Sequence, residues 1–108
     1  MENKFVKIAV YVDSDHADDV RKALSGSGAG RFNKYDNCSF SVKGTGRFRP
    51  LEGSNPAIGE VGKVEEVEEE RIETICLSER LGEVLAAVRA AHPYEEPAID
   101  VYPLLNIE

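Results

Sequence analysis

Four side chains that could exchange a proton or hold a metal ion lie in one short segment, residues 92–97 (HPYEEP). They are His92, Tyr94, Glu95 and Glu96. The segment also contains two prolines, and because proline cannot continue a helix, we expect it at a sharp helix end. Its polar groups are therefore expected together at one corner of the fold.

This segment has two interpretations. An imidazole with carboxylates suits zinc or copper, so His92, Glu95 and Glu96 could form a divalent-metal site, joined by Cys38 from a neighbouring subunit. The alternative is structural: His92 caps the last carbonyls of a helix, Tyr94 packs, and the prolines fix the turn. A single histidine with no second ligand at short spacing is a weak metal signature, which favours the structural interpretation.

A second cluster is cationic and consists of Lys43, Arg47 and Arg49. These residues border or lie within residues 44–60, a glycine-rich segment with two prolines that is expected to form a long loop. Guanidinium groups on such a loop suit a phosphate or carboxylate, so the cluster is the predicted small-anion site. The glycine spacing does not match a phosphate-binding loop, and shaping the loop is the alternative role of these glycines.

Other reactive side chains have simpler interpretations. The glutamates of residues 65–70 lack the spacing of a calcium loop and predict a solvated strand end. Cys38 could be a thiolate ligand or a redox group, but its alternation with Phe40 and Val42 favours a small buried hydrophobe. No general acid and base pair can be assigned, so we predict no enzyme activity.

Composition narrows the class of protein. The chain has 108 residues, with 13 basic and 20 acidic side chains and a formal net charge of −7. This length supports one domain, residues 1–108, with one modest core. The negative charge repels phosphate backbones and anionic lipids, so neither nucleic acid nor a membrane is an expected partner. Residues 1–12 hold only a short apolar stretch broken by Lys7, so no export signal is predicted and a cytoplasmic location is expected.

Hydrophobic periodicity predicts four strands and two helices. The strands are expected at residues 4–12, 35–43, 62–76 and 98–105, and the helices at residues 15–25 and from 78 to the proline at 93. The order β-α-β-β-α-β predicts an α+β, ferredoxin-like sandwich, an antiparallel sheet with both helices on one face. Phe5, Tyr11 and Tyr102 fall on the other face, and oligomerisation would cover them.

Three segments together resemble the CutA and PII-like trimeric proteins, namely residues 62–66 (GKVEE), 85–89 (LAAVR) and, most specifically, 92–97. A closer resemblance covers nearly the whole chain. It rests on residues 28–30 (GAG), 35–40 (YDNCSF), 44–53 (GTGRFRPLEG), 55–56 (NP) and 59–62 (GEVG). The chain looks like the CutA/PII-like domain inserted in bacterial Nif-three-like (YqfO) proteins.

This resemblance implies a homotrimer with a CutA-like core and no established activity. In the Nif-three-like family the insert is flanked by two halves that carry a dinuclear metal site. With only His16 and His92, this sequence cannot reproduce such a site, so a hydrolase or cyclohydrolase activity is not expected. The PII branch implies that ligands sit in clefts between subunits, with the loop after the second strand as the mobile element.

The leading hypothesis is therefore a non-enzymatic homotrimeric module that needs no cofactor. It would bind a small anionic ligand or a protein partner through residues 44–60 and the clefts between subunits. The alternative is a divalent-metal-binding protein of the CutA type, with His92 and Glu95 or Glu96 as ligands.

Overall fold

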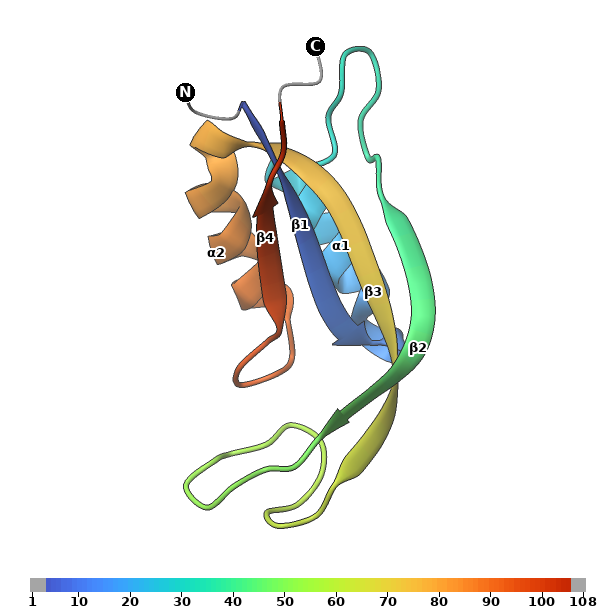
Figure 1. Ribbon diagram of the computed structural model, residues 1–108, viewed down its shortest axis with the longest axis vertical. Helices are drawn as coiled ribbons and strands as arrows, with labels where there is room; N and C mark the ends of the chain where they lie inside the picture. Colours follow the sequence, from blue (N-terminus) through green and yellow to red (C-terminus); the bar gives the residue numbers. More distant parts are fainter. Residues whose placement is uncertain (1–3, 106–108) are drawn as a thin grey trace.

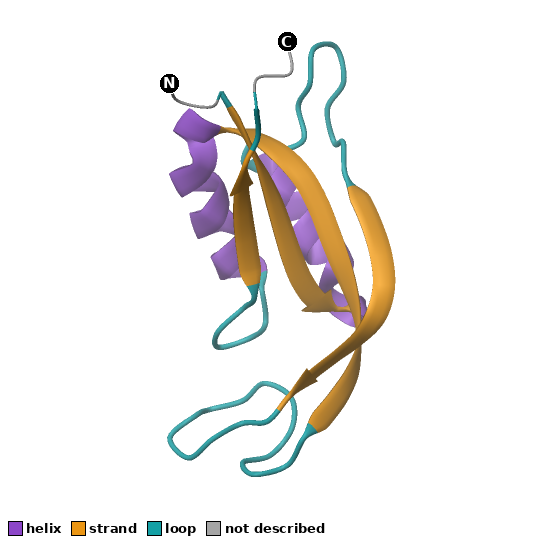
Figure 2. Ribbon diagram, in the orientation of Figure 1, coloured by secondary structure: helices purple, strands orange, loops and turns teal. Residues whose placement is uncertain are grey.

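The computed structural model describes residues 4–105. A four-stranded antiparallel sheet in the order β2-β3-β1-β4 carries two helices on one face (Figures 1 and 2). The elements are β1 (Phe5–Asp13), α1 (Ala17–Gly26), β2 (Phe40–Phe48), β3 (Glu65–Leu77), α2 (Leu81–Ala91) and β4 (Ile99–Pro103). This arrangement confirms the predicted ferredoxin-like α+β fold. No helix within the described range is long and apolar enough to span a bilayer.

Both helices begin later than the sequence predicts. A 3-10 turn, Ser14–His16, precedes α1, and a second one, Ser78–Arg80, precedes α2. Neither helix has a side-chain cap at its first turn. Ser14 and Ser78 therefore belong to the tighter turns that connect each strand to its helix.

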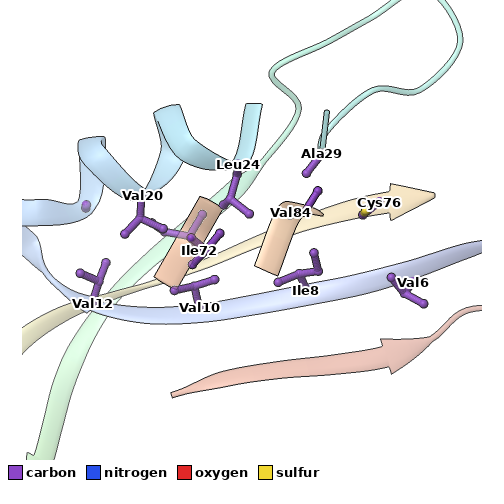
Figure 3. Packing of buried hydrophobic residues seen from close by; sticks show 12 residues of the cluster. Val6, Ile8, Val10, Val12, Val20, Leu24, Ala29, Ile72, Cys76 and Val84 are labelled. Atoms are coloured by element: carbon purple, nitrogen blue, oxygen red, sulfur yellow. The ribbon is translucent and has the colours of Figure 1, made fainter. Parts of the chain in front are cut away.

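The core lies between the helices and one face of the sheet (Figure 3). Alternate residues of β1 point into it, as the period of two predicts. Burying each of these valine or isoleucine side chains contributes roughly 1.5–3 kcal/mol. The buried cluster contains Val6, Ile8, Val10, Val12, Ala17, Val20, Leu24, Ala29, Ile72, Cys76, Val84 and Val88.

The opposite face of the sheet, called the open face below, carries no helix. Tyr11 pairs with Arg71, which pairs in turn with Val42, so these three side chains share this face. Phe40 lies on it as well, and Phe40 and Val42 are 67% and 51% exposed. The sequence placed both on the core side because an alternating pattern shows the period of a strand but not which face is buried.

Two other residues expected on this face have different surroundings. Phe5 is buried, and its ring lies 5.9 Å from the ring of Phe32, which covers it. Tyr102 is 43% exposed, as expected for the uncovered face.

The second strand is displaced from its predicted position. β2 begins at Phe40 rather than at residue 35, and Gly44–Phe48, which the sequence places in the long loop, pair with the first half of β3. β1 pairs with β3 only as far as Glu69, so β2 and β3 continue beyond it as a two-stranded ribbon (Figure 1). We call this ribbon and its connecting loop, counted from the pair Gly44–Glu69 and so spanning residues 44–69, the arm. The loop itself spans residues 49–64.

The prediction that Cys38 is buried is wrong. It precedes β2 and is exposed, whereas Cys76 is buried, and both are free thiols. The backbone of Cys38 is nevertheless fixed, because its N–H donates to the Gly30 carbonyl at 2.9 Å and its carbonyl accepts from the Thr74 hydroxyl at 2.6 Å.

Candidate functional site

A cleft of about 740 Å³ lies where the arm folds back toward the turn between α2 and β4. In Figure 1 the two loops approach each other below the sheet. The cleft combines apolar and aromatic side chains with charges of both signs. Its lining includes Tyr11, Arg47, Phe48, Arg49, Pro50, Leu51, Glu52, Pro56, Ile58, Glu69, Tyr94, Glu95, Glu96 and Ala98.

His92 joins the end of α2 to the end of β1. The helix stops at Ala91, and His92 has the extended backbone that a following proline demands. Its ring Nε2 lies 2.7 Å from the Tyr11 carbonyl oxygen, which can only accept, so Nε2 is the donor. The Tyr94 N–H donates to Nδ1 at 3.2 Å. Both ring nitrogens are therefore engaged inside the protein, and a metal ion would have to displace one of these bonds.

Tyr94 connects this turn to the arm. Its hydroxyl donates to Glu69 Oε2 at 2.8 Å, and its ring lies 6.2 Å from that of Phe48. Burial, together with the Glu69 carboxylate, raises the pKa of the Tyr94 phenol above its usual range. The phenol is therefore a neutral donor at physiological pH.

Gly46 provides the space for this connection. A Cβ atom at position 46 would overlap the Glu69 carboxylate. Glu69 can thus lie across the ribbon and reach the Tyr94 hydroxyl. The glycine within β2 serves a close approach between side chain and backbone, a recognised role of glycine in strands.

The two acidic residues of the turn have different partners. Glu95 Oε1 accepts a hydrogen bond at 3.0 Å from the backbone N–H of Asn55, which belongs to the arm loop. Glu96 is exposed and has no ion pair or hydrogen bond within residues 4–105. One carboxylate of the turn holds the arm loop, and the other is available to a ligand.

The predicted anion cluster is divided by the structure. Arg47 and Arg49 line the same cleft as Glu95 and Glu96. Arg47 is 3.5 Å from Glu66, and both side chains are 63% exposed, so this ion pair is weak. Lys43 lies outside the cleft and lines a smaller hollow of about 370 Å³ beside the ribbon.

The four predicted metal ligands are divided as well. Glu95 and Glu96 line the cleft, His92 is buried beneath it, and Cys38 lines a separate hollow of about 290 Å³ with Arg21 and Thr74. Within residues 4–105, no three His, Cys, Asp or Glu side chains are grouped so as to hold a metal ion.

Sequence reasoning missed two polar contributors to the cleft, Tyr11 and Glu69. A signal was present in the unequal lengths of the predicted strands. The third strand, residues 62–76, outruns the first, residues 4–12, so a ribbon had to extend past the body. The contact of that ribbon with the turn depends on tertiary geometry.

Known proteins resemble this chain in sequence and in fold. No protein-family model matches the chain. A Halalkalibacterium halodurans protein named GTP cyclohydrolase 1 type 2 homolog is 51% identical over 100 residues, which are 93% of this chain and 27% of that protein. Its namesake from Bacillus subtilis is 46% identical over 98 residues, or 91% of this chain and 26% of that protein. The chain thus spans about a quarter of the length of the curated relatives it matches.

A solved structure of a Bacillus cereus protein related to NIF3 matches with a TM-score of 0.84 and 46% identity, over 98% of this chain and 27% of that one. The chain is homologous to one segment of the NIF3-related proteins. The periplasmic divalent cation tolerance protein CutA from Archaeoglobus fulgidus matches with a TM-score of 0.68 and 24% identity, over 93% of this chain and 83% of CutA. That likeness shows the fold alone, and together the matches confirm the CutA-like, NIF3-related resemblance.

Proposed function

We propose that this chain is a non-enzymatic, self-associating CutA/PII-like module that binds a small ligand in the cleft between the arm loop and the turn at residues 92–98. The observation that supports this proposal most directly is that Arg47 and Arg49 line the same cleft as Glu95 and Glu96. A volume of about 740 Å³ is typical of a small-molecule site, as is a lining of apolar side chains with a few polar groups.

Binding suits the cleft better than proton transfer does. His92 uses both ring nitrogens in internal hydrogen bonds, and the Tyr94 phenol stays protonated while it donates to Glu69. A general base needs a free lone pair within reach of the substrate, which the His92 imidazole and the protonated Tyr94 phenol do not offer. The cyclohydrolase name belongs to relatives of which this chain spans only about a quarter, so the name does not argue for catalysis by this chain.

The same geometry does not favour the metal alternative. The CutA relatives are named for divalent cation tolerance, and Glu95 and Glu96 offer oxygen ligands. However, the Glu95 carboxylate holds the Asn55 N–H, and the His92 lone pair accepts from Tyr94. A divalent ion that took His92 as a ligand would have to break one of the two hydrogen bonds of the imidazole.

Self-association is supported by the open face. Phe40 and Val42 of β2 and Tyr102 of β4 are exposed on this face, at the two opposite edges of the sheet. Exposed large apolar side chains on a sheet face without helices suit an interface, and a second copy of the same chain is the simplest partner. We propose a homotrimer because the chain resembles trimeric CutA and PII-like proteins.

The ligand site can be tested by titrating the isotope-labelled protein with a panel of small anions, cations and neutral molecules and following the backbone amide resonances. We expect ligand-dependent shifts at residues 49–58 and 94–98. Ala98→Trp fills the cleft and should abolish them, whereas Ala90→Trp on the exposed surface of α2 should not. If no compound moves these resonances, or if Ala98→Trp leaves the shifts unchanged, the proposed site is refuted.

A further inference from the structure

The charges of the cleft do not balance. Four carboxylates line it, those of Glu52, Glu69, Glu95 and Glu96, against the guanidinium groups of Arg47 and Arg49. Arg47 is additionally paired with Glu66 of the ribbon. The whole chain carries a net charge of −7, so its long-range field has the same sign. A cleft lined by one predominant sign of charge concentrates ligands of the opposite sign, which here are cations.

The walls of the cleft also suit an organic cation. The rings of Tyr11, Phe48 and Tyr94 contribute to the lining, and an aromatic face attracts a cation electrostatically. The Tyr11 ring already makes such a contact with a cation, because the Arg71 guanidinium lies 5.7 Å from the ring centroid. Leu51 is exposed and adds an aliphatic surface.

Glu52 and Glu96 remain available for the charged head of such a ligand. Both side chains are exposed and make no ion pair or hydrogen bond with any other described residue. Glu69 and Glu95, by contrast, each accept a hydrogen bond from a neutral donor and fix the shape of the cleft.

We infer that the ligand of this cleft is an alkylammonium ion, that is, a protonated amine on an apolar chain. This inference rests on the proposed function of the cleft and names the chemistry of its ligand. Glu52 and Glu96 accept hydrogen bonds from the ammonium group, and the chain packs against Leu51 and the aromatic rings. Both a free diamine and the side chain of a lysine in a peptide have this chemistry.

Three probes of the same carbon chain length test the sign of the charge: cadaverine, 5-aminopentanoate and glutarate. Calorimetric titration at low salt should show the tightest binding for cadaverine and the weakest for glutarate. We expect the dissociation constants of cadaverine and glutarate to differ by about tenfold. Each exposed charge contact contributes up to about fivefold, and the two ammonium groups of cadaverine together set a limit of roughly 25-fold. Raising the salt concentration should reduce the difference, because exposed charges are screened.

Matched variants assign the contacts. Glu96→Gln should weaken cadaverine binding by about threefold, as expected for the loss of one exposed charge contact. Glu79→Gln, which removes an exposed carboxylate outside the cleft, should leave binding unchanged. Comparing pentylamine with N-acetyl-lysine methylamide, each with one ammonium group, distinguishes a free amine from a lysine side chain, since the tighter of the two identifies the source.

The outcomes separate this inference from the proposed function. If glutarate binds most tightly and Arg49→Ala abolishes its binding, the cleft is a ligand site but the alkylammonium assignment is wrong. The assignment is also wrong if cadaverine binds equally well to the Glu96→Gln variant and to the parent. If none of the three probes binds while another compound of the panel shifts the cleft resonances, only the assignment fails. If no compound shifts them, both fail.

Discussion

Replacing His92 with alanine is expected to lower the free energy of unfolding by about 3 kcal/mol, because it leaves two partly buried polar groups without partners. The residue is 7% exposed. It donates to the Tyr11 carbonyl at 2.7 Å and accepts from the Tyr94 N–H at 3.2 Å. Each group left unsatisfied costs about 1–3 kcal/mol, with the shorter bond in the upper part of that range. Water that enters the vacated space would recover part of this loss.

The measurement is urea unfolding of the parent, His92→Ala and His92→Gln. A glutamine amide can place its N–H near the position of the imidazole Nε2, so His92→Gln should recover about 1 kcal/mol by restoring the bond to the Tyr11 carbonyl. The dependence of the free energy on urea concentration should stay constant across the series, since the fold is unchanged.

Two results would refute this reasoning about His92. One is a loss below about 1 kcal/mol in His92→Ala, which is less than a single unsatisfied buried group should cost. The other is zinc-dependent stabilisation of the parent that His92→Ala abolishes. That result would make the imidazole a metal ligand, and the hydrogen bonds assigned to its nitrogens would not describe the bound state.

Three further predictions concern other parts of the molecule. Gly30→Ala should cost about 2 kcal/mol or more in thermal unfolding, because Gly30 has a φ of +78° and an added Cβ would lie 2.7 Å from the Cys38 carbonyl oxygen. The hydrogen bond that the His16 ring donates to the Asp13 carboxylate raises the pKa of His16 from 6.5, so its stabilising effect is present below pH 6.5 and lost as the pH rises through the folded-state pKa. Proton NMR would measure this pKa, and melting curves against pH would measure the change in stability. Phe40→Lys, on the open face, should shift the chain toward monomer in sedimentation equilibrium without lowering monomer stability, since Phe40 is 67% exposed.

Each of these has a matched control. Gly53 also has a positive φ, +94°, but its added Cβ would meet open space, so Gly53→Ala should cost less than Gly30→Ala; equal costs would refute the steric argument. Asp13→Asn should remove the pH dependence assigned to His16, and its persistence would contradict that assignment. Lys34→Glu changes an exposed residue outside the sheet and should leave the association state unaltered, whereas an unchanged state in Phe40→Lys would argue against the open face as the interface.

The fold was predictable because its two central strands and two helices have strong periodic patterns. Along β1, Val6, Ile8 and Val10 alternate with less apolar positions and are all buried, as a core-facing strand requires. In α2, Val84 and Val88 recur at helical spacing and are fully buried. Such local patterns determine the type of an element and, through the handedness of the connections, which face of the sheet the helices cover.

The position of β2 was less predictable, because it depends on a partner strand distant in sequence. Gly44 and Gly46 are typical of a loop, yet both pair with β3. A residue of β3 explains the glycine at position 46, since the Glu69 side chain occupies the space that a Cβ at that position would fill. A local propensity was overridden by a tertiary contact, which is usual for strands.

The cleft shows the same limit at a larger scale. Its two halves were recognisable from residue type, but their meeting depends on three contacts between segments far apart in sequence. These join Tyr94 to Glu69, Tyr94 to Phe48, and Glu95 to Asn55. Since all three connect the arm to the turn after α2, a ligand between these parts would bind only the docked arm. Ligand affinity and arm docking must then be linked, because anything that binds one conformation stabilises it in proportion to its affinity. Tyr94→Phe removes the hydroxyl bond while keeping the ring, so it should weaken ligand binding even though Glu52 and Glu96 are untouched.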